Sequence, residues 1–308
     1  MTFNRPVLVT GMPRSGTTWA GRMIGQASFV RYIHEPLNAG GHSCCCGAKF
    51  DYRYYYLTSK NVHKFYEHLK HTIYPAYTWI GFLNFMAEVW SSKRIRSSTN
   101  YLQSHLFYKP LVKDPTAIFS AGTLAELFQM DVVVLIRHPA AVVNSYKALS
   151  WKVPFLHFLH QPELMERHLS GFRPEIEGFV KNEYDVVDQV ALLWKLIHHM
   201  IIKYRETQPN WLFVRYEDLA SNPIEGFRSM FDQLRLPFTA RNRRIVQAHN
   251  SQHLLRESTD PYALRQRSDA AISKWQKNLT AAEICRIRER VESVSSIFYA
   301  AADWDMTP

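Results

Sequence analysis

Short apolar runs alternate with amphipathic stretches along this chain. The clearest run is residues 131–137, where Val-Val-Val-Leu-Ile is typical of a buried parallel strand. Four shorter apolar or β-branched runs of the same kind lie at residues 7–10, 30–33, 108–113 and 211–216. Strands that alternate with helical segments predict a parallel sheet with helices on both faces.

Helical periodicity or helix-start signals mark most of the remaining chain. They predict helices at residues 16–26, 59–71, 77–96, 117–129, 139–149, 183–207, 223–234, 240–249 and 281–300. Residues 150–180 hold prolines and aromatic residues without a clean period. No internal repeat, low-complexity tract or linker divides the chain. We therefore predict one α/β domain over residues 1–308, with insertions at about 40–105 and 150–180.

Composition and charge narrow the class of protein. The 308 residues are 46% hydrophobic and 21% charged, which excludes a disordered or collagen-like chain. No apolar run is long enough for a membrane-spanning helix. The formal charge of +10 predicts an anionic partner, which could be nucleic acid, a membrane surface, a nucleotide or an acidic glycan.

The cysteines and the N-terminus indicate a reducing compartment. Three of the four cysteines are consecutive, Cys44 to Cys46, and Cys285 stands apart, so a disulfide framework is not expected. His34 and His42 lie near the triplet, but the spacing matches no zinc pattern, and we predict no metal site. The chain begins without the features of a signal peptide. We expect a cytoplasmic protein.

A phosphate-binding loop follows the first predicted strand. Residues 11–18 read Gly-Met-Pro-Arg-Ser-Gly-Thr-Thr, in the frame G-x-x-x-x-G-x-T between a strand and a helix. Backbone N–H groups in such a loop face phosphate, and the start of the helix adds positive potential. Thr17 occupies the position of the lysine that nucleoside triphosphatases need, and the cation Arg14 lies inside the loop instead.

This loop resembles the 5′-phosphosulfate loop of sulfotransferases that use 3′-phosphoadenosine 5′-phosphosulfate (PAPS). The matching residues are 13–19, Pro-Arg-Ser-Gly-Thr-Thr-Trp, and arginine in place of lysine is the version found in tyrosylprotein and carbohydrate sulfotransferases. The resemblance implies a P-loop-like sulfotransferase fold and PAPS as sulfuryl donor. It also implies a set of donor-binding residues in this loop: Arg14, Ser15, Gly16, Thr17, Thr18 and Trp19.

Two further segments resemble the 3′-phosphate site of the same family. Arg137 ends the strongest strand and Ser145 lies eight residues on, about two helical turns, so both side chains can face one anion. Residues 268–280 resemble the segment that closes over the adenosine and the 3′-phosphate. There Trp275, Lys274 and Lys277 are the expected contacts, although Ala270, Ser273 and Gln276 depart from the pattern.

The catalytic groups are expected at strand ends near this loop. Glu35 follows the second predicted strand in His-Glu-Pro, and the resemblance to the arginine-loop enzymes makes it the general base. A carboxylate in a partly dry pocket would have a raised pKa. His34 is also a suitable base near neutrality. Lys113, in Lys-Asp-Pro, resembles the lysine that stabilises the sulfuryl group, together with Arg14.

The acceptor is less well defined by the sequence. Both insertions carry histidine, tyrosine, tryptophan and basic residues, which could contact a glycan, a lipid-linked sugar, a peptide tyrosine or a small alcohol. The Glu-Pro motif favours a carbohydrate, as a glycan or glycolipid. In-line sulfuryl transfer requires no metal. A P-loop phosphotransferase is the alternative that Thr17 disfavours. A nucleic-acid-binding protein is a further alternative, but no familiar nucleic-acid-binding motif is present.

Overall fold

The computed structural model describes residues 5–39, 47–74, 108–250 and 270–305. Five strands form one parallel sheet in the order β2-β3-β1-β4-β5. Their bounds are β1 Val7–Gly11, β2 Val30–His34, β3 Lys109–Lys113, β4 Asp131–Ile136 and β5 Leu212–Arg215. All five lie at the runs predicted from the sequence, and the single α/β domain fold is confirmed.

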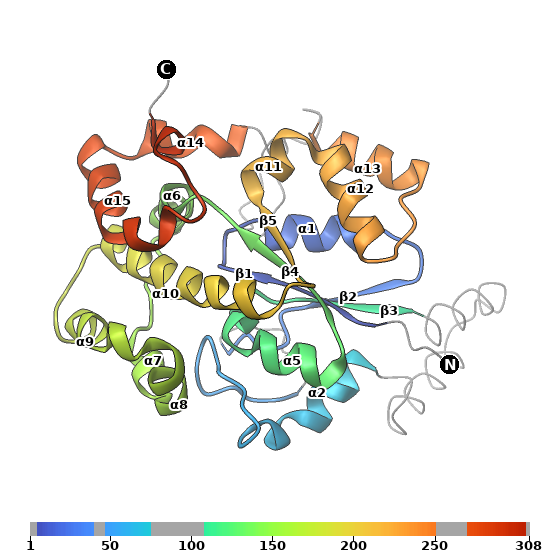
Figure 1. The fold of residues 1–308 in the computed structure, drawn as a ribbon, viewed down its shortest axis with the longest axis horizontal. Coiled ribbons are helices and arrows are strands. Elements are labelled where there is room, and N and C mark those ends of the chain that lie inside the picture. The colour runs from blue at the N-terminus through green and yellow to red at the C-terminus, as the bar shows by residue number, and fades with distance from the viewer. Residues whose placement is uncertain (1–4, 40–46, 75–107, 251–269, 306–308) are drawn as a thin grey trace.

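The sheet is buried on both faces, which explains why its strands read as continuous apolar runs. Alternate residues of β4 enter two separate cores, with Val132 and Val134 in one and Val133 and Leu135 in the other. In Figure 1, helices α1, α12 and α13 lie above the sheet and α2 and α5 lie below it. A parallel sheet covered in this way leaves only the strand ends for polar chemistry.

The helices follow most of the predicted segments with shifted ends. The α-helices on the upper face are α1 Thr17–Ile24, α11 Tyr216–Ser221, α12 Pro223–Gln233 and α13 Ala240–Asn250. The other long helices are α2 Tyr66–Ile73, α5 Ala121–Phe128, α6 Pro139–Leu149, α10 Val186–Thr207, α14 Ala270–Asn278 and α15 Ala281–Ser295. Single turns of 3-10 helix are η1 Val62–Lys64, η6 Ser170–Phe172 and η8 Ala301–Trp304, and η4 Pro115–Ser120 precedes α5.

The segment without a clean period is mostly helical. It contains α7 Leu156–Leu159, α8 Pro162–Leu164, a π-turn η5 Met165–Leu169 and α9 Arg173–Lys181. These pieces are too short, and change their hydrogen-bond register too often, to leave a 3.6-residue pattern in the sequence. Of the first predicted insertion the structure describes residues 47–74. The predicted helix at 77–96 and the triplet Cys44 to Cys46 lie outside the described residues.

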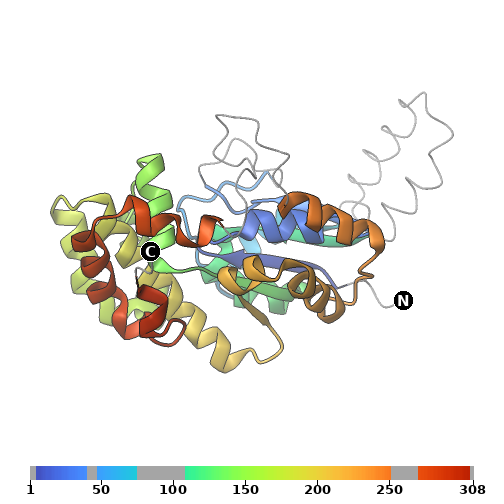
Figure 2. The same cartoon turned by 90° about the horizontal axis from the view of Figure 1, so that it is seen from above.

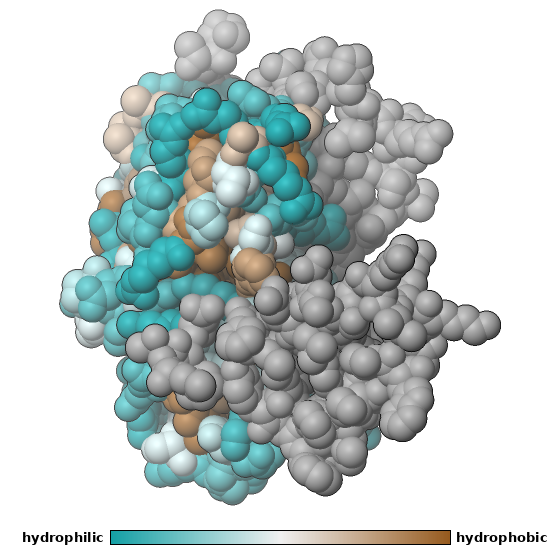
Figure 3. Space-filling view, turned by 90° about the vertical axis from the view of Figure 1, so that its right-hand side faces the viewer, coloured by the Kyte–Doolittle hydropathy of each residue, from teal (hydrophilic) through white to brown (hydrophobic). Residues whose placement is uncertain are grey.

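The two ends of the molecule are built from different helices. Figure 2 shows α10 (yellow) and α15 (red) together at one end, beside the sheet. On the opposite side, where α12 and α13 lie, a narrow band of apolar side chains reaches the surface between hydrophilic ones (Figure 3). Within the described residues, no helix has the length and apolar character needed to cross a membrane.

Candidate active site at the strand ends

The loop between β1 and α1 has the backbone of an anion-binding site. Gly11, Arg14 and Gly16 all have positive φ, at 141°, 73° and 93°. At Gly16 a side chain is excluded, because a Cβ atom there would lie 2.5 Å from the Tyr216 ring. The first turn of α1 has no side-chain cap and no acidic residue. Its N–H groups therefore remain available to an anion.

The side chains of this loop also fit a phosphate group. Ser15 and Thr17 are buried, and the Ser15 hydroxyl has no hydrogen-bond partner among the described residues. A buried hydroxyl without a partner is costly unless a ligand supplies one. Thr18, on the next position of α1, is half-buried. The loop therefore suits the 5′-phosphosulfate end of the donor that the sequence predicts.

The two predicted anion-binding segments meet at one place. The Arg14 Nε donates to the Ser145 Oγ at 2.8 Å, and the Arg137 Nη1 donates to the Arg14 carbonyl oxygen at 2.8 Å. The Arg137 guanidinium lies over the Tyr216 ring, 4.3 Å from its centroid. Tyr216, at the end of the apolar run 211–216, thus contacts both Gly16 and Arg137. Two guanidinium groups and a hydroxyl in this arrangement can bind a doubly charged phosphate.

Three hydrogen bonds fix the chain just after β4, where Arg137 lies. The Trp194 indole donates to the Arg137 carbonyl at 2.9 Å, and the Glu217 carboxylate accepts from the His138 backbone N–H at 2.9 Å and from the Tyr299 hydroxyl at 3.0 Å. The start of α11 has no side-chain cap, and Glu217 instead stabilises the end of the strand.

Glu35 and Lys113 form a buried ion pair between neighbouring strands. The register pairs His34 of β2 with Lys113 of β3, and the Glu35 N–H donates to the Lys113 carbonyl at 2.8 Å. This brings the Lys113 ammonium onto Glu35 Oε1, while Asn38 donates to Oε2 at 2.7 Å. The Lys113 side chain is fully buried, and α1 approaches it at Gly21, where a Cβ would lie 3.0 Å from the Lys113 Cγ.

The sequence predicts a raised pKa for Glu35, and this prediction is wrong. Burial raises the pKa of Glu35, as the sequence argument assumed, but the charge and hydrogen bond of Lys113, with His34 and Asn38, lower it by more. Its net pKa is therefore lowered. The sequence placed Lys113 and Glu35 at two strand ends without showing that they are direct partners. In the protein free of substrate, Glu35 is ionised but is a weaker base than predicted.

The turn that carries Glu35 is anchored by Asp114. Glu35 itself has a positive φ of 44°, which a non-glycine residue adopts only with support from its surroundings. Asp114 is fully buried and accepts from the Leu37 N–H at 2.6 Å and from the Thr116 N–H at 2.9 Å. Burial raises the pKa of Asp114 to about 6. These bonds hold the carboxylate of Glu35 at the edge of the sheet.

His34, the second candidate base, lies beside this pair. Its Nε2 is 3.9 Å from Glu35 Oε1, and its Nδ1 is 3.3 Å from the Tyr32 hydroxyl. Burial lowers the pKa of His34, and the positive charges of Lys113 and Arg22 lower it further. The imidazole is therefore mainly neutral at pH 7.

The aromatic residues expected at the donor are both in the core. Trp19 contacts Tyr216 and Phe227 edge-on, with ring centroids 5.7 and 5.2 Å apart. Trp275 is 3% exposed and stacks on His138 at 4.8 Å. Lys274 and Lys277 flank Trp275 on α14 and are exposed, with no ion pair to another described residue.

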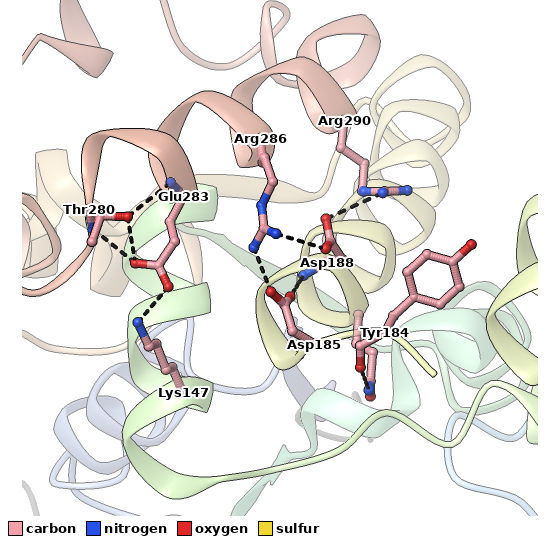
Figure 4. A network of polar contacts seen from close by, with 9 residues as sticks. Lys147, Tyr184, Asp185, Asp188, Thr280, Glu283, Arg286 and Arg290 are labelled. Atoms are coloured by element: carbon pink, nitrogen blue, oxygen red, sulfur yellow. Dashed lines mark hydrogen bonds and ion pairs between the residues drawn. The ribbon is translucent and has the colours of Figure 1, made fainter. Parts of the chain in front are cut away.

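An ion-pair network connects the segment after α14 to the helix that carries Ser145. The Glu283 carboxylate accepts from the Thr280 N–H at 2.9 Å in a capping box and pairs with Lys147 of α6 (Figure 4). Further along α15, Arg286 pairs with Asp185 at the start of α10. Asp185, Asp188 and Glu175 thus provide the acidic partners of α15. The network fixes the end of α14 relative to α6.

The two insertions meet on the side of Arg14. The Arg53 N–H donates to His157 Nδ1 at 2.9 Å, and Tyr52 lies 5.8 Å from the rings of His157 and His160. Trp151, which begins the second insertion, lies under the Arg14 guanidinium at 5.8 Å. Aromatic side chains of both insertions therefore lie together, and Trp151 adjoins the loop at Arg14; the acceptor-binding role of the insertions stays a prediction.

The parallel α/β fold places the loop after β1, the two arginines beside it and the carboxylate–lysine pair at the carboxyl ends of the strands, which is where α/β enzymes bind their ligands. Residues 6–240 match the model of the Sulfotransferase family. Because this match covers most of the chain, the chain belongs to the sulfotransferase family. It is accordingly a transferase.

Solved structures of sulfotransferases resemble this chain at low sequence identity. The sulfotransferase domain from the curacin biosynthetic pathway is 16% identical, with a TM-score of 0.49, over 95% of this chain and 99% of that one. The sulfotransferase domain of the Synechococcus PCC 7002 olefin synthase is 17% identical, with a TM-score of 0.47, over 97% and 96%. Sulfotransferase STF9 from Mycobacterium avium is 14% identical, with a TM-score of 0.46, over 97% and 78%. A comparison with curated protein sequences finds no match.

Proposed function

We propose that this protein transfers a sulfuryl group from PAPS to the hydroxyl of a carbohydrate acceptor, with Glu35 as general base. The observation that carries the proposal is the meeting of Arg14, Arg137 and Ser145 at the strand ends, next to the Glu35–Lys113 pair. Membership of the sulfotransferase family supports sulfuryl transfer in general. The donor, the acceptor class and the base are the parts that the proposal adds.

The donor assignment rests on two neighbouring anion sites, which Arg14 connects. The loop at Ser15 and Thr17, with the uncapped start of α1, suits the 5′-phosphosulfate. Arg137 and Ser145 suit the 3′-phosphate, which ordinary adenine nucleotides lack. The exposed Lys274 and Lys277 on α14 supply further positive charge for the nucleotide. Donor binding through two anion sites, as proposed, uses neither a kinase lysine nor a metal. Within the described ranges no three His, Cys, Asp or Glu side chains gather as a metal site.

The chemical step can be assigned to groups in this site. The acceptor oxygen forms a bond to sulfur, the bond between sulfur and the donor's bridging oxygen breaks, and that electron pair leaves with the phosphate. The acceptor proton passes to the Glu35 carboxylate. Arg14 and Lys113 offset the negative charge that develops on the sulfuryl and phosphate oxygens. As Lys113 turns toward these oxygens, it releases Glu35 Oε1, and the basicity of Glu35 rises toward what the reaction requires.

A carbohydrate acceptor is supported by the side chains that the insertions bring near Arg14. Tyr52, Trp151 and His160 are partly exposed rings that can stack on sugar faces. The Arg53 guanidinium makes no hydrogen bond or ion pair with the described residues, and it can bind an acidic group of the acceptor.

The cytoplasmic location inferred from the cysteines stays a prediction. Cys285 is a free, exposed thiol.

Binding of the product nucleotide tests the donor assignment. Adenosine 3′,5′-bisphosphate should bind at least about tenfold more tightly than AMP, because only the bisphosphate places a phosphate at Arg137 and Ser145. Isothermal titration of the purified protein measures both affinities. Arg137→Ala should remove most of the difference. Equal affinities in the unaltered protein would reject PAPS as the donor.

Two further measurements complete this test. Arg235→Ala is a matched control, since Arg235 is exposed near Asp131 at the other end of β4 and should leave both affinities unchanged. Radiolabelled PAPS, offered with glycans, a tyrosine peptide and simple alcohols in parallel, identifies the acceptor class. Transfer to the peptide alone would contradict the carbohydrate proposal and leave the donor assignment intact.

A further inference from the structure

Three polar side chains form a row that ends at the proposed base. Tyr32 and His34 lie two residues apart on β2, so both side chains are on the same face of the sheet. Their rings are 6.1 Å apart, with the Tyr32 hydroxyl 3.3 Å from His34 Nδ1. The other ring nitrogen, Nε2, is 3.9 Å from Glu35 Oε1. Each nitrogen of His34 thus faces a different chemical group.

In the contact between Tyr32 and His34, the tyrosine hydroxyl is the hydrogen-bond donor. Burial raises the pKa of Tyr32 to about 12, so the hydroxyl keeps its proton at neutral pH. The positive charge of Arg22 acts on the same hydroxyl and attracts its oxygen. The protonated hydroxyl lies 3.3 Å from His34 Nδ1, and its proton is the donor for that nitrogen. A nitrogen that accepts this bond carries no proton itself.

The carboxylate side leads to the same tautomer. The pKa of Glu35 is lowered, and an ionised carboxylate only accepts hydrogen bonds. The nitrogen that faces it is most stable with a proton. The charged groups that act on His34 are Glu35 (the residue after it), Lys113 from β3 and Arg22 from α1. The two cations oppose protonation of the ring, so it stays neutral with its one proton on Nε2.

We propose that His34 is a positioning residue for Glu35 and not a second base, because Tyr32 fixes its imidazole as the Nε2–H tautomer facing the Glu35 carboxylate. The proposal rests on the proposed function, in which Glu35 takes the acceptor proton. At 3.9 Å the His34 contact is electrostatic while Lys113 occupies Oε1. When Lys113 turns to the donor, His34 is the N–H group left beside Oε1, and it keeps the carboxylate ionised and oriented.

Nitrogen NMR tests the tautomer directly and needs no activity. Long-range ¹H–¹⁵N spectra of the histidine-labelled full chain distinguish Nε2–H from Nδ1–H rings, and the signals missing in His34→Gln identify His34. We expect Nε2–H in the unaltered protein and a rise of the Nδ1–H form in Tyr32→Phe. His63→Gln, at an exposed histidine, should leave the His34 signals unchanged. An Nδ1–H ring in the unaltered protein overturns the proposal, whether or not Tyr32→Phe folds.

The pH dependence of turnover separates a positioning role from a base. Loss of the fixed Nε2–H donor in Tyr32→Phe should raise the pKa of Glu35 and move the acid limb of kcat/KM up by about 0.5 pH unit, with the donor KM unchanged. His34→Gln keeps an amide N–H near the position of Nε2 and should retain activity within about tenfold. A loss beyond about a hundredfold in His34→Gln would make His34 a base. If no sulfuryl transfer occurs at all, the proposed function fails while the NMR result still decides the tautomer.

Discussion

Two clusters of charge in this protein differ in what surrounds them. The Glu35–Lys113 pair at the strand ends has side chains that are 8% and 0% exposed. The Asp185–Arg286 pair between α10 and α15 has side chains that are 50% and 45% exposed. The buried pair loses its hydration in the folded protein, whereas the exposed pair keeps most of it. Apolar residues can often replace a buried ion pair at little cost in stability. The burial of the Glu35–Lys113 pair beside the proposed anion-binding loop is therefore better explained by a chemical role than by stability.

The cluster around this exposed pair holds α15 against its neighbours instead. Arg286 pairs with Asp185 and Asp188, and Arg290 pairs with Asp188 (Figure 4). Arg290 also pairs with Glu175 of α9. Several members of the cluster have more than one partner, so the loss of one contact leaves the others in place. The strand-end cluster has no such redundancy, because Lys113 is the one cation that contacts Glu35 Oε1 within hydrogen-bond distance among the described residues. The two clusters should therefore respond very differently to single substitutions.

The largest effect is expected for Glu35→Gln. The amide keeps the shape of the carboxylate but cannot take the acceptor proton, so turnover should fall by about 10²–10⁴-fold. The buried Lys113 ammonium also loses its ionised partner, and the melting temperature should drop. Steady-state assays with PAPS measure the first effect, at a temperature where circular dichroism shows that the variant is folded.

Donor binding serves as the control for this variant. Affinity for adenosine 3′,5′-bisphosphate should stay near the original value, since Arg137 and Ser145 are unchanged. Glu177→Gln, on the exposed face of α9, should alter neither quantity. Turnover within a factor of three of the unaltered enzyme would remove Glu35 as the base and end the functional contrast between the two clusters.

A smaller, pH-dependent effect is expected at His138, which follows Arg137. The ring is buried against Trp275, both ring nitrogens lack a hydrogen-bond partner among the described residues, and burial lowers its pKa to about 3. The unfolded chain binds a proton there below about pH 6.5, so the stability that the neutral ring provides is complete above that pH. It is lost progressively as the pH falls toward 3.

His138→Phe keeps an aromatic ring and removes this titration. From pH 7 to pH 5 the unaltered protein should lose about 1–2 kcal/mol more unfolding free energy than the variant. Urea unfolding at the two pH values measures the difference, and His160→Phe, at an exposed histidine, is the matched control. If both proteins lost the same unfolding free energy, the end of the strand would tolerate a charged ring at His138. That result would contradict the expected difference between buried and exposed groups.

The strands were the most predictable part of the fold. A strand buried on both faces needs a continuous apolar run, so residues 131–137 could be read directly. The helical pieces between 150 and 180 could not, because a π-turn and several single turns follow one another there. Helix ends were also shifted; the helix predicted over 117–129 begins as the 3-10 segment η4.

In the site, residue types were predictable but their partners were not. The frame of the loop and the strand ends located Arg14, Glu35 and Lys113. Lys113 contacts Glu35 because β3 lies beside β2 in the sheet. Local sequence patterns do not predict the order of the strands. The error in the pKa of Glu35 followed from this. The contacts of Trp194 with the Arg137 carbonyl were missed for the same reason, because they join residues far apart in the chain.

The smallest effect is expected in the exposed cluster, for Arg286→Ala. In this variant Asp188 still forms its ion pair with Arg290 at 3.3 Å, and Asp185 still accepts a hydrogen bond from the Asp188 N–H at 2.9 Å. Neither carboxylate is therefore left buried without a partner. Unfolding free energy should fall by about 0–1 kcal/mol, and turnover should not change. Thermal unfolding at low and high salt measures this, with Arg228→Ala on α12 as the control. Most of any difference should vanish in high salt, because exposed pairs are screened. A salt-independent loss of more than about 3 kcal/mol in unfolding free energy would mean that this cluster behaves like the buried pair. Solvent exposure would then no longer distinguish a structural contact from the proposed catalytic one.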